Sequence, residues 1–473
     1  MTAAPPDVGV RVPRAFGRVA LALGVITSLI APSVARAAEG GLNLIRDTEI
    51  EEILHAENDP VFAAAGLNPK TTKILIQSDK DMNAFTVSGQ VMGVTTGLIA
   101  ETRTPNELVG VMAHETGHAA GGHNARSGEL GRAGIRPMLL TLGLGLLAAA
   151  AGAPDAAAAM LLSSPGMAQQ GMLNYSRVQE GAADQAAVTY LVKAKQSPKG
   201  LVEFFDNFRY EEVFSEARRH RYFLSHPLSS ERIELLRRRA EGTPTYKVED
   251  TAAEIERHKL MQAKLDGFIE PPGQTYQKYK EADKSFPARY ARAIAYYKAG
   301  ETERALTALD ALIVEQPTNP YLYELKGQVL FEAGRPKEAE APHRRATELK
   351  PDAPLLRVNL AQAILAQDKA ARTDEVIAQL QKALAYEDDN SFAWALMAQA
   401  YDGKGEAGQA RLASAEEHFA IGDLDRARVF AMRAREQLKP GTVQWRRATD
   451  IVLASKPSKD DVKRVAEKPG AAG

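Results

Sequence analysis

Apolar side chains recur at helical spacing over much of the chain. This spacing predicts helices within residues 41–66, 176–195, 229–239 and 249–268. An Asn-Asp-Pro sequence at 58–60 predicts that the first of these segments is broken into two short helices. Ser, Pro, Gly and Gln at 161–171 predict a non-helical stretch before the second. The chain is therefore expected to be mainly α-helical.

A different pattern predicts a small β-sheet followed by a capped helix. Residues 73–77 and 85–95 are rich in β-branched side chains and are bounded by Asp, Asn and Gly, as expected of strands. Thr104 then provides an N-cap, Pro105 a first helical residue and Glu107 a capping-box carboxylate. A helix is therefore predicted to begin at Pro105.

Two uncharged apolar runs lie at 138–153 and 156–162. As α-helices they are about 24 Å and about 10 Å long, whereas the hydrocarbon core of a bilayer is about 30 Å thick. Neither run is long enough to span a membrane. We interpret 138–162 either as a helical hairpin in peripheral contact with a membrane or as a buried hairpin.

The C-terminal half repeats with a period of 34 residues, the length of a tetratricopeptide unit. Small residues, a turn Gly and a helix-ending Pro recur in phase: Ala293, Gly300, Ala305 and Pro317 correspond to Gly327, Gly334, Ala339 and Pro351. Less regular units follow, so four to five helical pairs are predicted.

The predicted fold is mainly α: an α+β domain with a small sheet, followed by an α-solenoid of tetratricopeptide repeats. Residues 1–37 combine a basic segment, a short apolar core and an Ala-Arg-Ala cleavage site, which predicts a cleaved signal peptide and export. The α+β domain is assigned to 38–269 and the repeats to 274–440, with a Pro-Pro-Gly linker between them. A C-terminal helix and a disordered tail are assigned to 441–473.

Composition restricts the chemistry that the chain can perform. Its 473 residues include 59 Lys and Arg against 60 Asp and Glu, so no sequence-wide basic field favours nucleic acid, and none is expected as a partner. There are 0 Cys, which excludes disulfides, thiolate metal ligands and a Cys nucleophile. A metal site therefore has to use His and carboxylate ligands.

The predicted capped helix carries an H-E-x-x-H motif formed by His114, Glu115 and His118. Residues four apart lie on one helix face, so both imidazoles can bind one tetrahedral Zn²⁺. Glu115 then faces the water that the metal activates and serves as the general base.

A third protein ligand has to come from elsewhere. A His ten residues after the first is not available, because position 124 is Asn, and we interpret His123 as a surface residue or a support for a ligand. Glu180 is the favoured third ligand, with Asp184 placed to hold the other ring nitrogen of a ligating His. A Glu-x-x-x-Asp pair is a weak signal alone, but this pair lies in an Ala-rich helix face suited to close packing.

The chain resembles the HtpX/BepA-like family of membrane-associated zinc metallopeptidases, which are gluzincins. The segments that carry the resemblance are the H-E-x-x-H motif, Asn83 to Phe85, Thr96 to Leu98, Ser176 to Asp184, and Ser225-His226-Pro227 with Arg232. They cover about 40–240, and the repeats extend the resemblance over nearly the whole chain after the signal.

The resemblance implies a periplasmic metalloendopeptidase with one Zn²⁺ per chain, held by His114, His118 and Glu180. It also implies a role in outer-membrane protein assembly and quality control, as a protease and chaperone. The implied partners are unfolded or misassembled proteins and, through the repeats, the outer-membrane β-barrel assembly machinery.

The resemblance also implies functions for two residues outside the ligand set. In such members the His of the His-Pro segment occupies the open zinc position and keeps the enzyme latent, a function that falls here on His226. Arg232 is expected to pair with a carboxylate near the site or to stabilise the tetrahedral intermediate. Both residues, with Glu115, are the candidate catalytic residues.

Two functional hypotheses stand side by side. The first is an exported zinc endopeptidase, and the second is a chaperone or scaffold for outer-membrane protein assembly with a latent metal site. Glu115 favours the first, because a structural metal site has no use for a general base. Residues 90–96 are either a sheet edge to which an extended peptide adds, or an internal strand.

Overall fold

The computed structural model describes residues 43–87, 90–123, 137–142, 144, 154–209, 221–367 and 372–466. The predicted signal peptide at 1–37 lies outside the described residues. None of the described helices combines the length and the apolar character that crossing a bilayer requires.

Four short strands form one mixed sheet in the order β1-β2-β4-β3. The strands are β1 (Leu44–Ile45), β2 (Lys73–Gln77), β3 (Ala84–Val87) and β4 (Val91–Thr95). β4 pairs in parallel with β2 and antiparallel with β3. Residues 90–96 are thus internal, so their interpretation as a sheet edge is wrong, and the described edge strands are β1 and β3.

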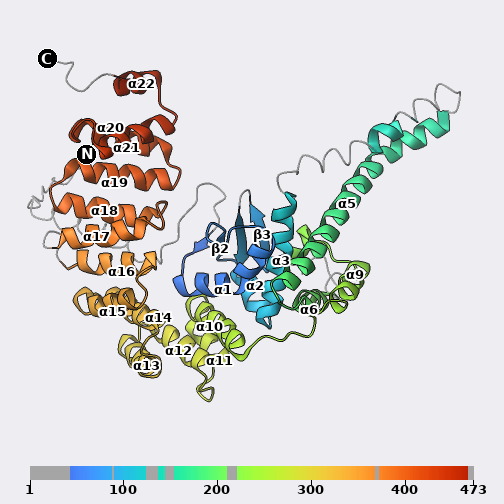
Figure 1. Ribbon diagram of the computed structural model, residues 1–473, viewed down its shortest axis with the longest axis horizontal. Helices are drawn as coiled ribbons and strands as arrows, with labels where there is room; N and C mark the ends of the chain where they lie inside the picture. The colour runs from blue at the N-terminus through green and yellow to red at the C-terminus, as the bar shows by residue number, and fades with distance from the viewer. Residues whose placement is uncertain are drawn as a thin grey trace, which may run out of the picture.

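Helices pack against this sheet, and together with it they form the first domain (Figure 1). They are α1 (Thr48–Ala64), α2 (Thr96–Glu101), α3 (Pro105–Gly121), α5 (Pro154–Lys193), α6 (Lys199–Phe208), α8 (Arg221–Ser225), α9 (Ser230–Glu241) and α10 (Ala252–Ile269). α3 contacts α1, β3, α5 and α6, which makes it the central helix of the domain.

Two predicted helix breaks are absent. α1 continues through Pro60, because Val61 and Phe62 just beyond it are fully buried, and their burial outweighs the cost of a Pro in a helix interior, about 3 kcal/mol. α5 runs without interruption for 40 residues through the Ser-, Pro- and Gly-containing stretch at 161–171, so the prediction of a non-helical stretch there is wrong. In α1, tertiary packing thus overrides the local breaker.

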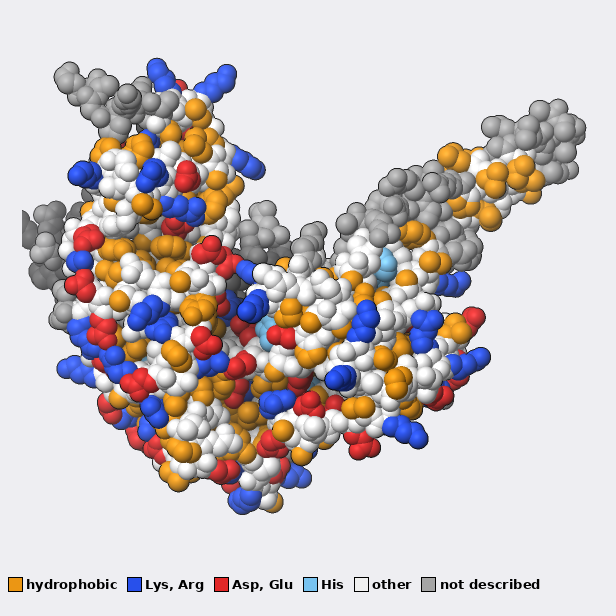
Figure 2. All heavy atoms as spheres, in the orientation of Figure 1, with side chains coloured by type: hydrophobic (Ala, Val, Ile, Leu, Met, Phe, Trp, Pro, Cys, Tyr) orange, Lys and Arg blue, Asp and Glu red, His pale blue; other side chains and the backbone are white. Residues whose placement is uncertain are grey.

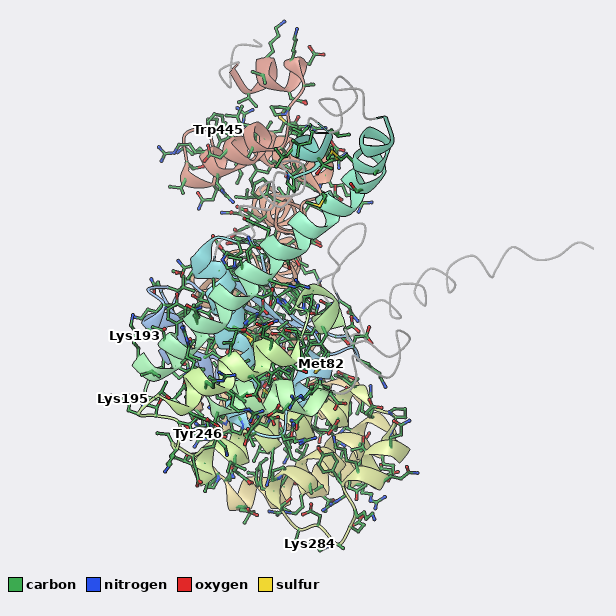
Figure 3. The ribbon with its side chains drawn as sticks, turned by 90° about the vertical axis from the view of Figure 1, so that its right-hand side faces the viewer. Met82, Lys193, Lys195, Tyr246, Lys284 and Trp445 are labelled. Atoms are coloured by element: carbon green, nitrogen blue, oxygen red, sulfur yellow. The ribbon has the colours of Figure 1, made fainter. Side chains whose placement is uncertain are left out.

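The N-terminal part of α5 projects away from the domain (Figure 1). Figure 2 shows hydrophobic side chains on the described part of this projection, and Figure 3 shows its length from a second direction. Leu139 and Leu140, which precede α5 in the chain, have side chains that are 57% and 67% exposed. Residues 145–153 lie outside the described residues, so membrane contact through 138–162 stays a prediction.

The C-terminal half is an array of paired helices. After α11 (Pro272–Lys278), the described part of the chain forms five successive pairs: α12 (Phe286–Lys298) with α13 (Thr302–Glu315), α14 (Pro320–Glu332) with α15 (Pro336–Leu349), α16 (Pro354–Leu365) with α17 (Thr373–Leu384), α18 (Ser391–Gly403) with α19 (Ala407–Ala420), and α20 (Leu424–Gln437) with α21 (Val443–Ala454). Gly300 and Gly334 have φ values of +77° and +76°, as the turn positions of the repeat require. The predicted mainly α fold is confirmed.

The predicted disordered tail contains one further helix, α22 (Lys459–Ala466). Ser458 Oγ donates to Asp461 Oδ2 at 2.8 Å, and Arg428 Nε lies 3.3 Å from the same carboxylate. The first contact caps the helix and the second joins its start to α20 of the last repeat, so part of the segment assigned as a disordered tail is helical. Residues 467–473 lie outside the described residues.

The two halves of the chain share a buried ion cluster. Lys264 of α10 has its Nζ 2.8 Å from Asp47 and 2.9 Å from Glu49, at the start of α1. Tyr290 Oη of α12 donates to Glu49 at 3.0 Å. Burial lowers the pKa of Lys264, but the two carboxylates raise it well above its usual value. The Lys264 ion pair therefore lies within the first domain, and Tyr290 and the packing of α12 on α10 join the repeats to it. The boundary assigned at 270–273 stays a proposal.

Replacing Lys264 by Ala is expected to destabilise the protein by about 3–5 kcal/mol, because it leaves Glu49 buried without its cation. Urea unfolding followed by tryptophan fluorescence measures the change. The control is Lys73→Ala, since Lys73 pairs with Asp389 at 2.7 Å with both side chains more than half exposed, and about 1 kcal/mol or less is expected. Equal losses in the two variants would contradict the stabilising effect of the buried cluster.

Candidate metal centre

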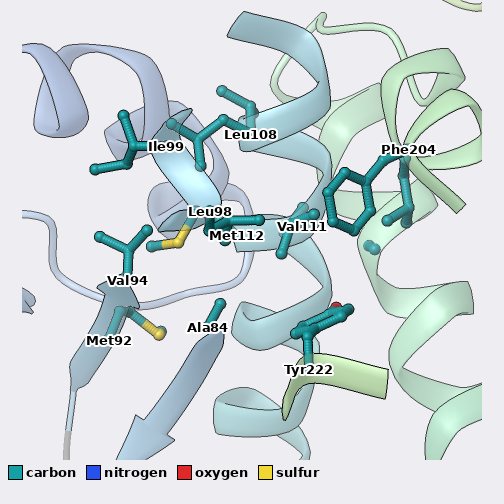
Figure 4. Packing of buried hydrophobic residues seen from close by; sticks show 14 of the residues in the cluster. Ala84, Met92, Val94, Leu98, Ile99, Leu108, Val111, Met112, Phe204 and Tyr222 are labelled. Carbon is teal, nitrogen blue, oxygen red and sulfur yellow. The ribbon is translucent and has the colours of Figure 1, made fainter. Parts of the chain in front are cut away.

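The metal-binding motif lies on a helix that is fixed at its start and along its buried face. Thr104 Oγ1 accepts from the backbone N–H of Glu107 at 3.2 Å, and Glu107 Oε2 accepts from Arg103 N at 2.6 Å. Met112 and Val111 are fully buried, Met112 near Leu98 of α2 and Val111 facing Phe204 of α6 (Figure 4). The last two turns of α3 therefore hold their side chains in a defined direction.

α3 and α5 approach each other most closely at Gly117. A Cβ atom there would lie 2.8 Å from the backbone oxygen of Ala183, so only glycine permits this helix separation. The contact brings the face of α3 that carries His114 and His118 opposite the face of α5 that carries Glu180 and Asp184.

Four of the sequence-predicted residues meet in one buried cluster. His114, His118, Glu180 and His226 each offer a ligand atom, and these atoms lie within 4.8 Å of one another. The Nε2 atoms of His114 and His118 are 3.0 Å apart. Oxygens of Glu180 lie 3.3 Å and 3.4 Å from these two nitrogens.

The donor set fits a divalent cation. Two imidazole nitrogens and a carboxylate oxygen come close together, in side chains that are at least nine-tenths buried. Burying these polar groups costs free energy, and a cation bound between them would compensate that cost. Imidazole and carboxylate are ligands of tetrahedral Zn²⁺ sites, and His226 is the fourth group of the cluster. The assignment of the ligands and of zinc stays a prediction.

Asp184 and Arg232 support this cluster from one side. Oδ1 of Asp184 lies 2.9 Å from Nδ1 of His114. Arg232 donates to both oxygens of Asp184, at 2.7 Å and 2.8 Å, and its NH1 lies 3.0 Å from Glu180 Oε2. Of the two expectations for Arg232, this geometry agrees with pairing to a carboxylate near the site.

The ionic contacts shift several pKa values. Burial would raise the pKa of Asp184, but Arg232 and His114 hold it at about 2. Burial would likewise raise the pKa of Glu180, and its three His neighbours lower it instead. Burial lowers the pKa of His114, whereas Asp184 and Glu180 raise it to about 9. Both carboxylates are therefore ionised at neutral pH and available to a cation.

Glu115 and His226 face each other across the cluster. Glu115 is 1% exposed, and its Oε1 lies 3.4 Å from Nε2 of His226. Nδ1 of His226 is 3.1 Å from both oxygens of Glu180 and 3.4 Å from Nε2 of His114. His226 thus lies between the predicted general base and the predicted ligands.

Two further contacts complete the surroundings of the cluster. Tyr222 stacks on His226 with ring centroids 4.6 Å apart and an interplanar angle of 30°. His123, for which the sequence leaves a surface or a supporting position open, has its Nδ1 2.9 Å from Nδ1 of His118. Tyr222 and His226 are four residues apart, a spacing that could have indicated their contact, whereas the contact of His123 depends on how α3 ends.

Comparison with known proteins agrees with this arrangement. Residues 46–240 match peptidase family M48, and residues 290–354 match a tetratricopeptide repeat family. The chain is 24% identical over 419 residues to the beta-barrel assembly-enhancing protease of Escherichia coli (strain K12), covering 87% of this chain and 84% of the relative.

Two further relatives are also named as proteases. The beta-barrel assembly-enhancing protease of Yersinia pestis is 25% identical over 411 residues, which is 85% of this chain and 83% of the relative. Metalloprotease LoiP of Escherichia coli (strain K12) is 30% identical over 175 residues, 37% of this chain and 64% of that protein. Residues 46–240 of this chain are therefore a domain of peptidase family M48, and tetratricopeptide repeats follow it.

Proposed function

We propose that this protein is a periplasmic zinc-dependent endopeptidase that hydrolyses misfolded or stalled outer-membrane proteins. The observation that carries the proposal is the buried carboxylate of Glu115 beside a convergent set of two imidazoles and Glu180. The names of the relatives, which combine protease with β-barrel assembly, support the reaction and its cellular context. The predicted signal peptide supports export.

The chemistry follows from the positions of the side chains. A zinc ion on His114, His118 and Glu180 would polarise the scissile carbonyl and lower the pKa of a water molecule. Glu115 would take the proton of the attacking water and pass it to the leaving amine. Asp184 would hold the imidazole of His114 in the tautomer that leaves Nε2 free.

The edge strand β3 is the candidate binding surface for an extended substrate. It is an outer strand of the described sheet and contacts α3, the helix of the H-E-x-x-H motif. Val87 at its end is 40% exposed. A peptide that adds to this edge would bind through main-chain hydrogen bonds, which suits substrates of varied sequence.

His226 is proposed to keep the site latent. Its Nδ1 lies among the ligand atoms and its Nε2 lies beside Glu115, so its ring fills the space in which water and the substrate carbonyl would have to sit. The stacked ring of Tyr222 holds it there. Release of His226 would open the site.

The repeats are proposed to bind clients or the outer-membrane β-barrel assembly machinery. Stacked helical pairs present an extended surface for protein partners. Contacts from Tyr290 to Glu49 and from Asp389 to Lys73 join this surface to the first domain. Because His226 blocks the metal site, a second function is also supported, as a chaperone or scaffold with a latent site.

Replacing Glu115 by Gln is expected to abolish cleavage while leaving about one zinc per chain, because the general base is lost but the ligands remain. Replacing Glu180 by Ala is expected to remove both zinc and activity. The measurements are metal content by mass spectrometry and cleavage of an unfolded outer-membrane β-barrel protein. Residual proteolysis by purified Glu115→Gln would refute the assignment, and zinc binding without cleavage in the wild type would favour the scaffold.

Replacing His226 by Ala is expected to raise basal kcat/KM by about tenfold or more, because the ring no longer fills the space that water and the substrate carbonyl require; tenfold corresponds to about 1.4 kcal/mol. Hydrolysis of a quenched fluorescent peptide measures it. His55→Ala is the control, because His55 pairs with Asp59 on α1, away from the cluster. Unchanged or reduced activity in His226→Ala would show that His226 is not an inhibitory ligand.

Replacing Gly117 by Ala is expected to weaken zinc binding, because the new Cβ would lie 2.8 Å from a backbone oxygen of α5 and force the two helices apart. Chelator competition measures the affinity. Gly181→Ala is the matched control on α5, since a Cβ there meets no atom within 4 Å. Equal zinc affinity in both variants would contradict the requirement for close helix packing.

A further inference from the structure

The imidazole of His118 is contacted at both of its nitrogens. Its Nε2 lies 3.0 Å from Nε2 of His114, inside the cluster, and its Nδ1 lies 2.9 Å from Nδ1 of His123. The rings of His118 and His123 have centroids 4.9 Å apart and an interplanar angle of 78°. This edge-on arrangement is the geometry of a ring N–H that points at a ring lone pair.

The C-terminus of α3 directs His123 back to His118. Gly122 takes a left-handed φ of +63° and donates its N–H to Ala119 O at 3.0 Å. His123 donates its N–H to His118 O at 3.1 Å. These two bonds form a Schellman motif, in which the chain reverses over the last helical turn.

Gly121 leaves the space that the ring of His123 occupies. A Cβ atom at position 121 would lie 2.7 Å from Nε2 of His123 and 3.1 Å from two of its ring carbons. The position of His123 therefore depends on Gly121 for space and on Gly122 for backbone direction.

The donor and the acceptor of the hydrogen bond between His118 and His123 are fixed if His118 binds a cation through Nε2. That nitrogen then keeps its lone pair, so the proton of neutral His118 is on Nδ1 and is donated to His123. Nδ1 of His123 must accept it, and the proton of His123 is on Nε2. At the other predicted ligand, Oδ1 of Asp184 lies 2.9 Å from Nδ1 of His114.

We propose that His123 is a positioning residue of the metal centre, which fixes the tautomer and ring orientation of His118 by accepting its Nδ1–H. This inference rests on the proposed metal-binding function. The two ligand imidazoles are then held by different partners, a carboxylate for His114 and a neutral imidazole for His118. Outer partners of this kind typically contribute 10- to 100-fold to metal affinity.

The first test measures zinc affinity by chelator competition in His123→Ala and His123→Asn. About 10- to 100-fold weaker binding is expected for Ala. Asn is expected to recover most of the affinity, because its Oδ1 is bonded to Cγ, as Nδ1 of His is, and can accept the same hydrogen bond from His118. His55→Ala is the control for loss of a histidine that bonds within one helix, at 2.8 Å to Asp59, and should leave the affinity unchanged.

The second test is Gly121→Ala, which keeps both imidazoles but displaces the ring of His123. Alanine has a higher helix propensity than glycine, so thermal stability should not fall, whereas zinc affinity should. In ¹⁵N spectra of the zinc-loaded wild type, His118 should carry its proton on Nδ1. Wild-type zinc affinity in both His123→Ala and Gly121→Ala, or equal losses in His123→Ala and His123→Asn, would overturn the proposal. A wild type that binds no zinc would overturn the metal-binding function itself, a distinguishable result.

Discussion

The arrangement of the site depends on the short distance between α3 and α5. At Gly117 the two helices lie close enough that a Cβ would overlap the α5 backbone. Because helix side chains at i and i+4 share a face, this one contact aligns two residues of α3 with two of α5. The imidazole nitrogens and Glu180 oxygens then lie about one hydrogen-bond length apart in a buried space.

Electrostatic balance is the second constraint, because the site buries several charges together. Arg232 compensates two carboxylates at once and lies over the ring of Phe205, 5.0 Å from its centroid. Such a group stabilises only when its charges are paired, since an unpaired buried charge costs several kcal/mol. A divalent cation among the imidazoles and Glu180 would complete the pairing, which links folding of the domain to metal binding.

The sequence predicted those parts of the structure whose signal is local. H-E-x-x-H on a capped helix, strand β2, and the repeat period each depend on residues close together in the chain. The breaks expected at 58–60 and 161–171 did not form, and in α1 the burial of the residues just beyond Pro60 outweighs the local breaker. β4 could not be distinguished from an edge strand, since pairing partners are a tertiary property.

The same distinction applies to the site. Glu180 and Asp184 were found from a small-residue helix face, and Arg232 was left with two alternatives because its partner comes from another helix. The contact between His123 and His118 depends on the left-handed Gly122, which pattern spacing does not reveal. The partner of a ligand can thus be predicted where it shares a patterned helix face, as Asp184 does, but not where a turn of the backbone places it, as for His123.

The central claim is that one zinc ion binds between α3 and α5. Anomalous diffraction from crystals of the full chain, recorded on both sides of the zinc absorption edge, tests it most directly. The account predicts one strong peak among Nε2 of His114, Nε2 of His118 and the carboxylate of Glu180. No peak there in crystals grown with zinc, or a peak held by other residues, would contradict it.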